Sequence, residues 1–179
     1  RRALERVGRT GVLAFGGNPG SQETVEALSA AATDMSRRRF GALIVLERDT
    51  GLQDYVETGI QVDALASPEL IEGVFYPNSP LHDGAVIIRG DTIVGAGCIL
   101  PLSQAQNIDR TLGTRHRAAI GLSEESDALV IVVSEETAQI AGAENGRLIR
   151  GLTAPQLRDI IAGGKPRSTA EHPLLQIPG

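Results

Sequence analysis

Two short polar segments carry residue types that could bind a phosphorylated ligand. Residues 81–85 read Leu-His-Asp-Gly-Ala, and residues 113–117 read Gly-Thr-Arg-His-Arg. Together they contain two of the three histidines in the chain, one aspartate and two arginines. Apolar residues that a fold would bury flank both segments, and a buried polar group needs a partner. Both segments are therefore candidates for a functional site.

The second segment has the chemistry of a phosphate cradle. Arg115 and Arg117 offer planar forks of donors that match phosphate oxygens, and Thr114 adds a hydroxyl group. The residues that follow are predicted to start a helix, whose first amide groups attract anions. The segment is not a P-loop, because the chain contains no Gly-x-x-x-x-Gly-Lys-Ser/Thr string. The alternative is a surface arginine pair beside a histidine of the core.

The first segment and a later acidic run could serve metal and proton chemistry. Asp83 could accept a proton from a hydroxyl group or bind a divalent metal, and His82 could supply a nitrogen ligand. Gly84 would allow a ligand to approach the backbone closely. Residues 134–136, Ser-Glu-Glu, end a predicted buried strand. Taken singly, these are an ordinary Asp-Gly turn and a solvated strand end. Taken together with the arginines, they indicate nucleotide chemistry with Mg²⁺ or Mn²⁺.

Composition limits the class of protein. The 179 residues, 41% hydrophobic and 22% charged, fit one compact domain with a tail. A net charge of −5 argues against nucleic-acid or anionic-lipid partners, which need a clustered basic surface. Cys98 is the single cysteine and excludes an internal disulfide, so we interpret it as a small core residue. The longest apolar runs have the length of strands and are too short to span a membrane. The first residues do not resemble a signal peptide. The basic start indicates that the chain is a piece of a longer protein.

The hydrophobic pattern predicts an α/β fold in which helices cover a central sheet. Strands are expected at residues 41–47, 60–65, 85–88, 92–100, 127–133, 139–141 and 147–149, the first of them in a central position. Helices are expected at residues 1–8, after Ser21, after Ser67, at 118–122 and after Thr153. The basic run at residues 37–39 is interpreted as helix capping and solvation. Residues 1–20 would be a helix fragment with a Gly-rich linker, 21–164 the main folded domain and 165–179 an irregular tail.

Four strings, in the same order, resemble signatures of the diadenylate cyclase domain. They are residues 81–86 (LHDGAV), 100–103 (LPLS), 113–119 (GTRHRAA) and 133–137 (VSEET). The similarity extends from about Arg1 to the last predicted helix and is closest to the membrane-anchored bacterial type, whose catalytic domain follows transmembrane helices. Several long signatures in register are far more specific than one Gly-rich string. The resemblance implies a central mixed, mainly buried β-sheet flanked by helices.

The resemblance also implies an activity and a set of site residues. Diadenylate cyclases join two ATP molecules into cyclic di-AMP and release two pyrophosphates, with a divalent metal, Mg²⁺ or Mn²⁺. Catalytic roles are implied for Asp83, Gly84, Ala85, Arg115, His116 and Arg117. Nucleotide contacts are implied for Thr114, Ser134, Glu135, Glu136, Leu100 and Ile99. Metal ligation is implied for Asp83, His82 and Glu136.

The resemblance further implies partners and a location. Each subunit would bind one ATP, and two identical subunits would meet face to face. Anchoring through a segment absent from this chain would hold the domain at the cytoplasmic face of the cell membrane. Two alternatives remain: a catalytically inactive nucleotide-binding sensor, and a scaffold domain with a structural polar network. The intact Asp83 and Arg-His-Arg string argue against the sensor.

Overall fold

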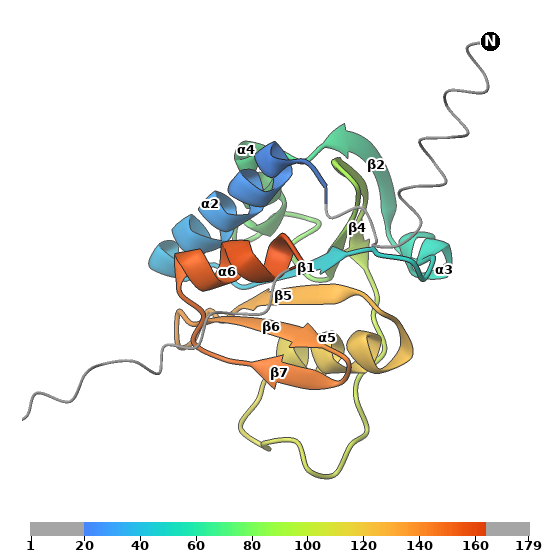
Figure 1. Cartoon of the computed structure of the whole chain (residues 1–179), viewed down its shortest axis with the longest axis vertical. Helices are drawn as coiled ribbons and strands as arrows, with labels where there is room; N and C mark the ends of the chain where they lie inside the picture. The colour runs from blue at the N-terminus through green and yellow to red at the C-terminus, as the bar shows by residue number, and fades with distance from the viewer. Residues whose placement is uncertain (1–19, 164–179) are drawn as a thin grey trace, which may run out of the picture.

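The computed structural model describes residues 20–163, which form a seven-stranded sheet with helices on both faces (Figure 1). The strands are β1 Ala42–Leu46, β2 Ile60–Leu65, β3 Ala85–Arg89, β4 Thr92–Cys98, β5 Leu129–Val133, β6 Ile140–Glu144 and β7 Arg147–Ile149. The helices are α2 Gln22–Arg38, α3 Gln53–Val56, α4 Pro68–Phe75, α5 Thr114–Glu125 and α6 Ala154–Ile161. The predicted helix at residues 1–8, the linker and the tail lie outside the described residues.

The sheet is mixed, as expected. Its strand order is β2-β4-β3-β1-β5-β6-β7, and β1 and β3 form its parallel pair while the other neighbours are antiparallel. Every strand predicted from the sequence is present, with ends that differ by a few residues. The predicted central position of the first strand is confirmed, because three strands lie on each side of β1.

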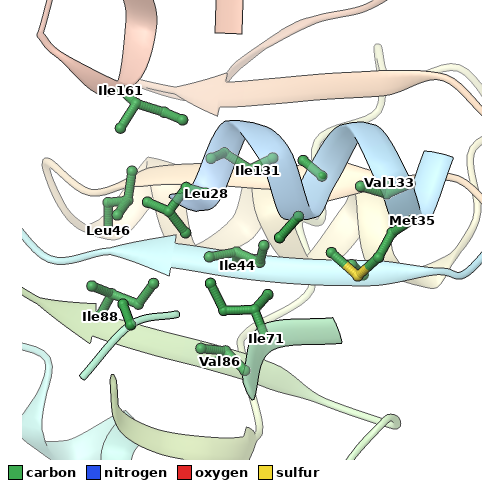
Figure 2. Close-up of a cluster of buried hydrophobic side chains, with 14 of the residues drawn as sticks. Leu28, Met35, Ile44, Leu46, Ile71, Val86, Ile88, Ile131, Val133 and Ile161 are labelled. Carbon is green, nitrogen blue, oxygen red and sulfur yellow. The ribbon is translucent and has the colours of Figure 1, made fainter. Parts of the chain in front are cut away.

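Strand β1 separates two apolar cores. All five of its residues are buried, and alternate side chains point to opposite faces of the sheet. Ile44 and Leu46 pack in the core that α2, α4 and α6 cover, which Figure 2 shows. Leu43 and Val45 pack in the second core, beneath α3 and α5. A continuous apolar run therefore identified a strand that is covered on both faces.

The helix starts follow the capping signals in the sequence. The side chains of Ser21 and Ser67 accept hydrogen bonds from amide groups three residues further on, and Thr153 forms a complete capping box with Gln156. None of the helices among residues 20–163 is long and apolar enough to cross a membrane. Cys98 is buried, as predicted, and burial raises the pKa of its thiol to about 11.

Two helices differ from the expectation. The four-residue helix α3 lies in a stretch that the sequence pattern left without structure. Helix α5 begins at Thr114 and not at residue 118, so most of the second polar segment forms its first turn. The residue before it, Gly113, provides no side-chain cap, so the sequence gives no start signal there. Without a capping side chain to mark the start, the sequence pattern placed it four residues too late.

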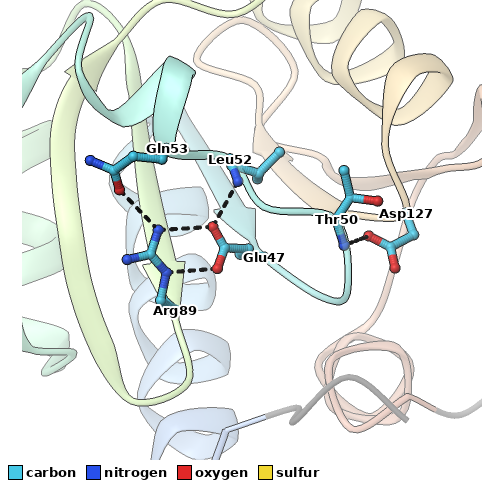
Figure 3. A network of polar contacts seen from close by, with 6 residues as sticks. All are labelled: Glu47, Thr50, Leu52, Gln53, Arg89 and Asp127. Atoms are coloured by element: carbon cyan, nitrogen blue, oxygen red, sulfur yellow. Dashed lines mark hydrogen bonds and ion pairs between the residues drawn. The ribbon is translucent and has the colours of Figure 1, made fainter. Parts of the chain in front are cut away.

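A polar network at one edge of the sheet holds the segment that leads into α3 (Figure 3). Glu47 accepts hydrogen bonds from Arg89 Nε at 2.7 Å and Nη2 at 3.1 Å, and from the Leu52 amide at 3.0 Å. Asp127 accepts from the Thr50 amide at 3.0 Å. These bonds fix the start of α3, whose far end leads to the opposite edge of the sheet.

Candidate functional site

The strand directions bring the polar segments to one edge of the sheet. Strands β1 and β3 begin at this edge, and because β4 and β5 run antiparallel to them, those two strands end there. Strand β6 begins at the same edge and β7 ends there. Residues 81–85, 99–103 and 134–136 therefore lie beside one another, with the first turn of α5. The topology explains why signatures far apart in the sequence can share one site.

These segments enclose a cavity of about 710 Å³, a size suited to one small-molecule ligand. Its wall includes most of the site residues expected from the sequence: His82, Asp83, Gly84, Ile99, Leu100, Thr114, Arg115, His116, Ser134, Glu135 and Glu136. Ala85 and Arg117 do not line it. Ala85 lies in the core beneath the wall, and the Arg117 backbone carbonyl accepts a hydrogen bond from the Ser103 amide at 3.0 Å.

Other wall residues were not expected from the sequence. They are Leu43, Cys98, Leu102, Thr111, Leu112, Gly113, Ala118, Val133, Thr137, Gln139, Ala141 and Arg150. Some of them belong to the four strings quoted above, although no site role was assigned to them: Leu102, Gly113, Ala118, Val133 and Thr137. Most of the others are apolar or small, and their types do not indicate a site before the fold is known. Arg150 is the exception, because it adds a second guanidinium to the wall beside that of Arg115. A lone arginine after a short strand carries no motif that would have identified it.

Arg115 lies where a neighbouring residue has no side chain. A Cβ atom placed on Gly41, just before β1, would lie 2.4 Å from Arg115 Nη1. The guanidinium also pairs with Glu135, with 3.4 Å between Nη1 and Oε1. Any larger residue at position 41 would displace the guanidinium from this place. Sequence reasoning missed this contact between Gly41 and Arg115, because a glycine before an apolar run is usually only the end of a turn.

The first turn of α5 combines fixed dipoles with charge. The first amide groups of a helix have no acceptors within the helix, and Thr114, Arg115 and His116 all line the cavity. His116 is half-buried, and burial lowers the pKa of its imidazole, with the positive charges of Arg150 and Arg115 acting in the same direction and Glu136 opposing them. The imidazole is therefore neutral at neutral pH, and the charge at this end of the cavity comes from the arginines.

Helix α2 holds the acidic loop that follows β5. Arg39 Nη1 donates to the carbonyl of Glu136 at 2.9 Å, and the Ser36 hydroxyl donates to the carbonyl of Ala138. Within the loop, the Ser134 and Ala138 backbones form a tight turn through a 3.0 Å hydrogen bond. The basic run at the end of α2, interpreted from the sequence as capping and solvation, therefore also positions the loop that carries Glu135.

The apolar side of the cavity follows β4. The Ile99 amide donates to Thr58 Oγ1 at 2.8 Å, which fixes the backbone while the Ile99 side chain stays 68% exposed at the rim. Leu100 is buried behind it. A Cβ atom on Gly121 of α5 would lie only 2.0 Å from the carbonyl oxygen of Pro101. Because Gly121 has no side chain, residues 100–103 can pack directly against α5.

The segment 81–85 offers one imidazole nitrogen and one carboxylate. His82 Nδ1 lies 2.6 Å from the Ser79 carbonyl oxygen, which can only accept, so Nδ1 carries the proton and Nε2 keeps its lone pair. Gly84 has φ +148°, and a Cβ atom there would lie 2.7 Å from the carbonyl carbon of Gly97, so only glycine fits. Among residues 20–163, no group of three or more His, Cys, Asp or Glu side chains could hold a metal ion by itself.

The chain is similar to a known protein family and to named bacterial proteins. A family model, DAC, described as DisA bacterial checkpoint controller nucleotide-binding, matches residues 29–148. The chain is 47% identical over 174 residues to the Bacillus subtilis (strain 168) protein named cyclic di-AMP synthase CdaA, covering 96% of this chain and 64% of that protein. It is 44% identical over 176 residues to a diadenylate cyclase of Listeria monocytogenes serotype 1/2a (strain 10403S), covering 97% and 64%. The chain thus spans less than two thirds of the length of these curated relatives.

Two solved structures are similar to this one. A crystal structure of DacA from Staphylococcus aureus, carrying two cysteine substitutions, superposes with a TM-score of 0.78 at 48% identity and covers 79% of this chain and 95% of that chain. The crystal structure of a Bacillus cereus protein, described as a hypothetical membrane-spanning protein, has a TM-score of 0.71 at 47% identity and covers 73% and 64%. The α/β fold expected from the sequence is confirmed.

Proposed function

Since this chain belongs to the DAC family of DisA bacterial checkpoint controller nucleotide-binding domains, we propose that it condenses two ATP molecules into cyclic di-AMP and releases two pyrophosphates. The observation that carries this proposal is a cavity whose wall brings together Asp83, Arg115 and the Ser134–Glu135 turn. These are the acid, the phosphate-binding cation and the hydroxyl-acid pair that the reaction needs. Relatives named as diadenylate cyclases support the reaction class.

Asp83 is the proton acceptor in this proposal. The 3′-hydroxyl of one ribose attacks the α-phosphorus of the other ATP, and its proton passes to the Asp83 carboxylate. The new bond joins O3′ to the α-phosphorus, and the bond from that phosphorus to the bridging oxygen breaks as pyrophosphate leaves. A positioned carboxylate of this kind accelerates such a step by about 10²- to 10⁴-fold. Gly84 lines the cavity beside Asp83, and its lack of a side chain lets the segment pack closely on the Gly97 backbone.

The first turn of α5 holds the triphosphate. Arg115 and the Thr114 hydroxyl, with the first amides of α5, would bind the phosphate oxygens and stabilise the charge that develops on them. His116 lines the cavity in the same turn, where its imidazole would donate a hydrogen bond to a phosphate oxygen. We assign Arg117 and Ala85 to supporting roles, because neither lines the cavity. Arg117 holds Ser103 through its backbone, and Ala85 packs beneath the wall.

The base would lie against the end of β4. Ile99 and Leu100 present aliphatic surface there. Leu102, 46% exposed, extends the same surface at the cavity wall. Contact between the base and these side chains is hydrophobic and does not depend on stacking of aromatic rings.

A divalent metal fits the donors at this edge only with help from the substrate. His82 offers Nε2, Asp83 and Glu136 offer carboxylates, and the protein alone supplies no cluster of three such groups among the described residues. Phosphate oxygens would complete the shell, as is usual for metal ions in nucleotide sites. A bound Mg²⁺ or Mn²⁺ would neutralise charge on the triphosphate. An imidazole donor favours Mn²⁺ over the harder, oxygen-preferring Mg²⁺.

The product requires two copies of the site. Cyclic di-AMP consists of two identical halves joined by two identical bonds, and each cavity has the size for one ATP. Two subunits related by a twofold axis would hold two ATP molecules face to face, so that each nucleophile meets the α-phosphate of the other ATP. We therefore propose that a homodimer is the active form and that one chain carries half of the reaction.

We further propose that the domain works at the cytoplasmic face of the cell membrane, anchored by a segment outside this chain. The description of the Bacillus cereus protein as membrane-spanning supports this location. The net charge of −5 gives no support for a nucleic-acid partner. A sensor that binds ATP without converting it is the second candidate, and the intact set of Asp83, Arg115 and Ser134 in the cavity favours the enzyme.

The substitution Asp83→Asn tests the proposed activity. It removes the proton acceptor and keeps the shape of the side chain, so synthesis of cyclic di-AMP should fall by at least about 100-fold. Binding of 3′-deoxy-ATP, which lacks the attacking hydroxyl group, should remain close to that of the wild type. Asp54→Asn, on α3 and outside the cavity, is the matched control. Turnover of ATP by Asp83→Asn at the wild-type rate would overturn the assignment.

A further inference from the structure

Arg150 is the one cationic residue of the cavity wall that the proposed mechanism does not use. It follows β7, lines the cavity, and belongs to none of the signatures in the sequence. Its guanidinium pairs with Asp109 of the loop between β4 and α5, with 3.4 Å between Nη1 and Oδ2. The side chains of both residues are 47% exposed. An exposed pair with one long contact contributes little to stability, so the guanidinium is available to a better partner.

The strand order places Arg150 beyond the phosphate cradle. Along the edge of the sheet, the order runs from β4, with Ile99 and Leu100 at its end, through β3, β1 and β5 to β6 and β7. The expected base contacts lie at the β4 end, and Ser134 and Glu135 follow β5. Arg150 lies two strands further, at a spacing of about 4.8 Å per strand. A nucleotide with its base at β4 and its α-phosphate at α5 therefore points its terminal phosphates toward Arg150.

We propose that Arg150 binds the terminal phosphates of ATP, the part that leaves as pyrophosphate, and exchanges Asp109 for that contact. This inference rests on the proposed function. A guanidinium binds phosphate oxygens through two parallel hydrogen bonds, which is a stronger contact than the single one it makes to Asp109. The lowered pKa of His116, to which the charge of Arg150 contributes, agrees with a guanidinium close to the triphosphate end of the cavity.

The loop does not depend on Arg150 for its shape, so the exchange is feasible. Asp109 Oδ1 accepts hydrogen bonds from the Thr111 amide at 2.9 Å and from the Thr111 hydroxyl at 2.7 Å. These bonds close a local turn of the loop and would persist when Arg150 turns to the phosphates. Arg150 thus contacts the leaving group, whereas Arg115 contacts the phosphate that is attacked.

Binding of two nucleotides that cannot react tests this assignment. Calorimetric titration of the wild type and of Arg150→Gln would use 3′-deoxy-ATP and 3′-deoxy-AMP with Mn²⁺. The substitution should weaken binding of 3′-deoxy-ATP by at least about tenfold, because a charged hydrogen bond to the terminal phosphates is lost. Binding of 3′-deoxy-AMP should be unchanged. Arg150→Lys should recover part of the lost affinity. Arg147→Gln, at the start of β7 and outside the cavity wall, should change neither affinity.

The other outcomes separate this inference from the function on which it rests. Equal affinity of the wild type and Arg150→Gln for 3′-deoxy-ATP would overturn the role of Arg150 and leave the proposed function intact. An equal loss of affinity for both nucleotides would also overturn the role of Arg150, because Arg150 would then act on the whole site. If the wild type bound neither nucleotide, the proposed function would fail and this inference with it. The unfolding temperature of each variant, compared with that of the wild type, is the control for an intact fold.

Discussion

Arg115 occupies its place because Gly41 has no side chain. In Gly41→Ala the new methyl group would lie 2.4 Å from Nη1, and the end of a long side chain is free to move away. We expect the guanidinium to shift, the affinity for ATP to fall by about tenfold or more, and the unfolding temperature to change little. Calorimetric binding and thermal unfolding measure the two effects.

Gly51→Ala is a matched control for this prediction, because a Cβ atom at Gly51 would meet nothing within 4 Å. It should leave both the affinity and the unfolding temperature close to those of the wild type. If Gly41→Ala bound ATP as tightly as the wild type, while Arg115→Ala lost binding, the position of Arg115 against Gly41 would have no bearing on the site.

His116 makes the stability of the fold depend on pH. Its pKa lies below the ordinary value of 6.5, so the folded state binds fewer protons than the unfolded state as the pH falls through that value. The free energy of unfolding is therefore highest above pH 6.5 and falls on acidification until the folded-state pKa is passed. Urea unfolding at about pH 7.5 and about pH 5.5 should show a larger loss for the wild type than for His116→Gln. Equal losses in the two proteins would contradict this account.

At the scale of elements, the turn after α3 supports the end of β4. Thr58 Oγ1 accepts from the Ile99 amide at 2.8 Å and donates to the Tyr55 carbonyl at 2.6 Å. Thr58→Val keeps the shape but loses both bonds, so we expect a loss of about 1–2 kcal/mol in stability and a several-fold higher KM for ATP. Thr58→Ser, which retains the hydroxyl group, should behave like the wild type in steady-state kinetics. An unchanged KM in Thr58→Val would show that this turn does not position the base.

The elements differ in how well the sequence predicts them. Continuous apolar runs predicted the buried strands, and the caps at Ser67 and Thr153 predicted two helix starts, because these signals are local. Helix α5 starts earlier than expected, and no capping side chain in the sequence marks its first turn. Gly41 and Arg150 were not predicted from the sequence, because their proposed roles depend on contacts between segments that are distant in the chain. The strand order that brings them together follows from no single residue.

At the scale of the whole molecule, the proposed anionic substrate would bind an acidic protein at a place where cationic groups gather. The chain carries a net charge of −5, yet Arg115, Arg150 and the first turn of α5 face the same cavity. The proposed product has twofold symmetry and each cavity has the size for one ATP, so two chains would act together in one reaction. An activity that depends on association must depend on the concentration of the chain.

The rate of cyclic di-AMP formation per subunit, measured against chain concentration, tests this account most directly. The assay would follow ATP with Mn²⁺ or Mg²⁺ by chromatography across the concentrations at which light scattering detects the change from monomer to dimer. We predict that cyclic di-AMP is the product and that turnover per subunit rises with the dimer fraction to a plateau. Absence of cyclic di-AMP at every concentration, or the same turnover per subunit from monomer to dimer, would contradict it.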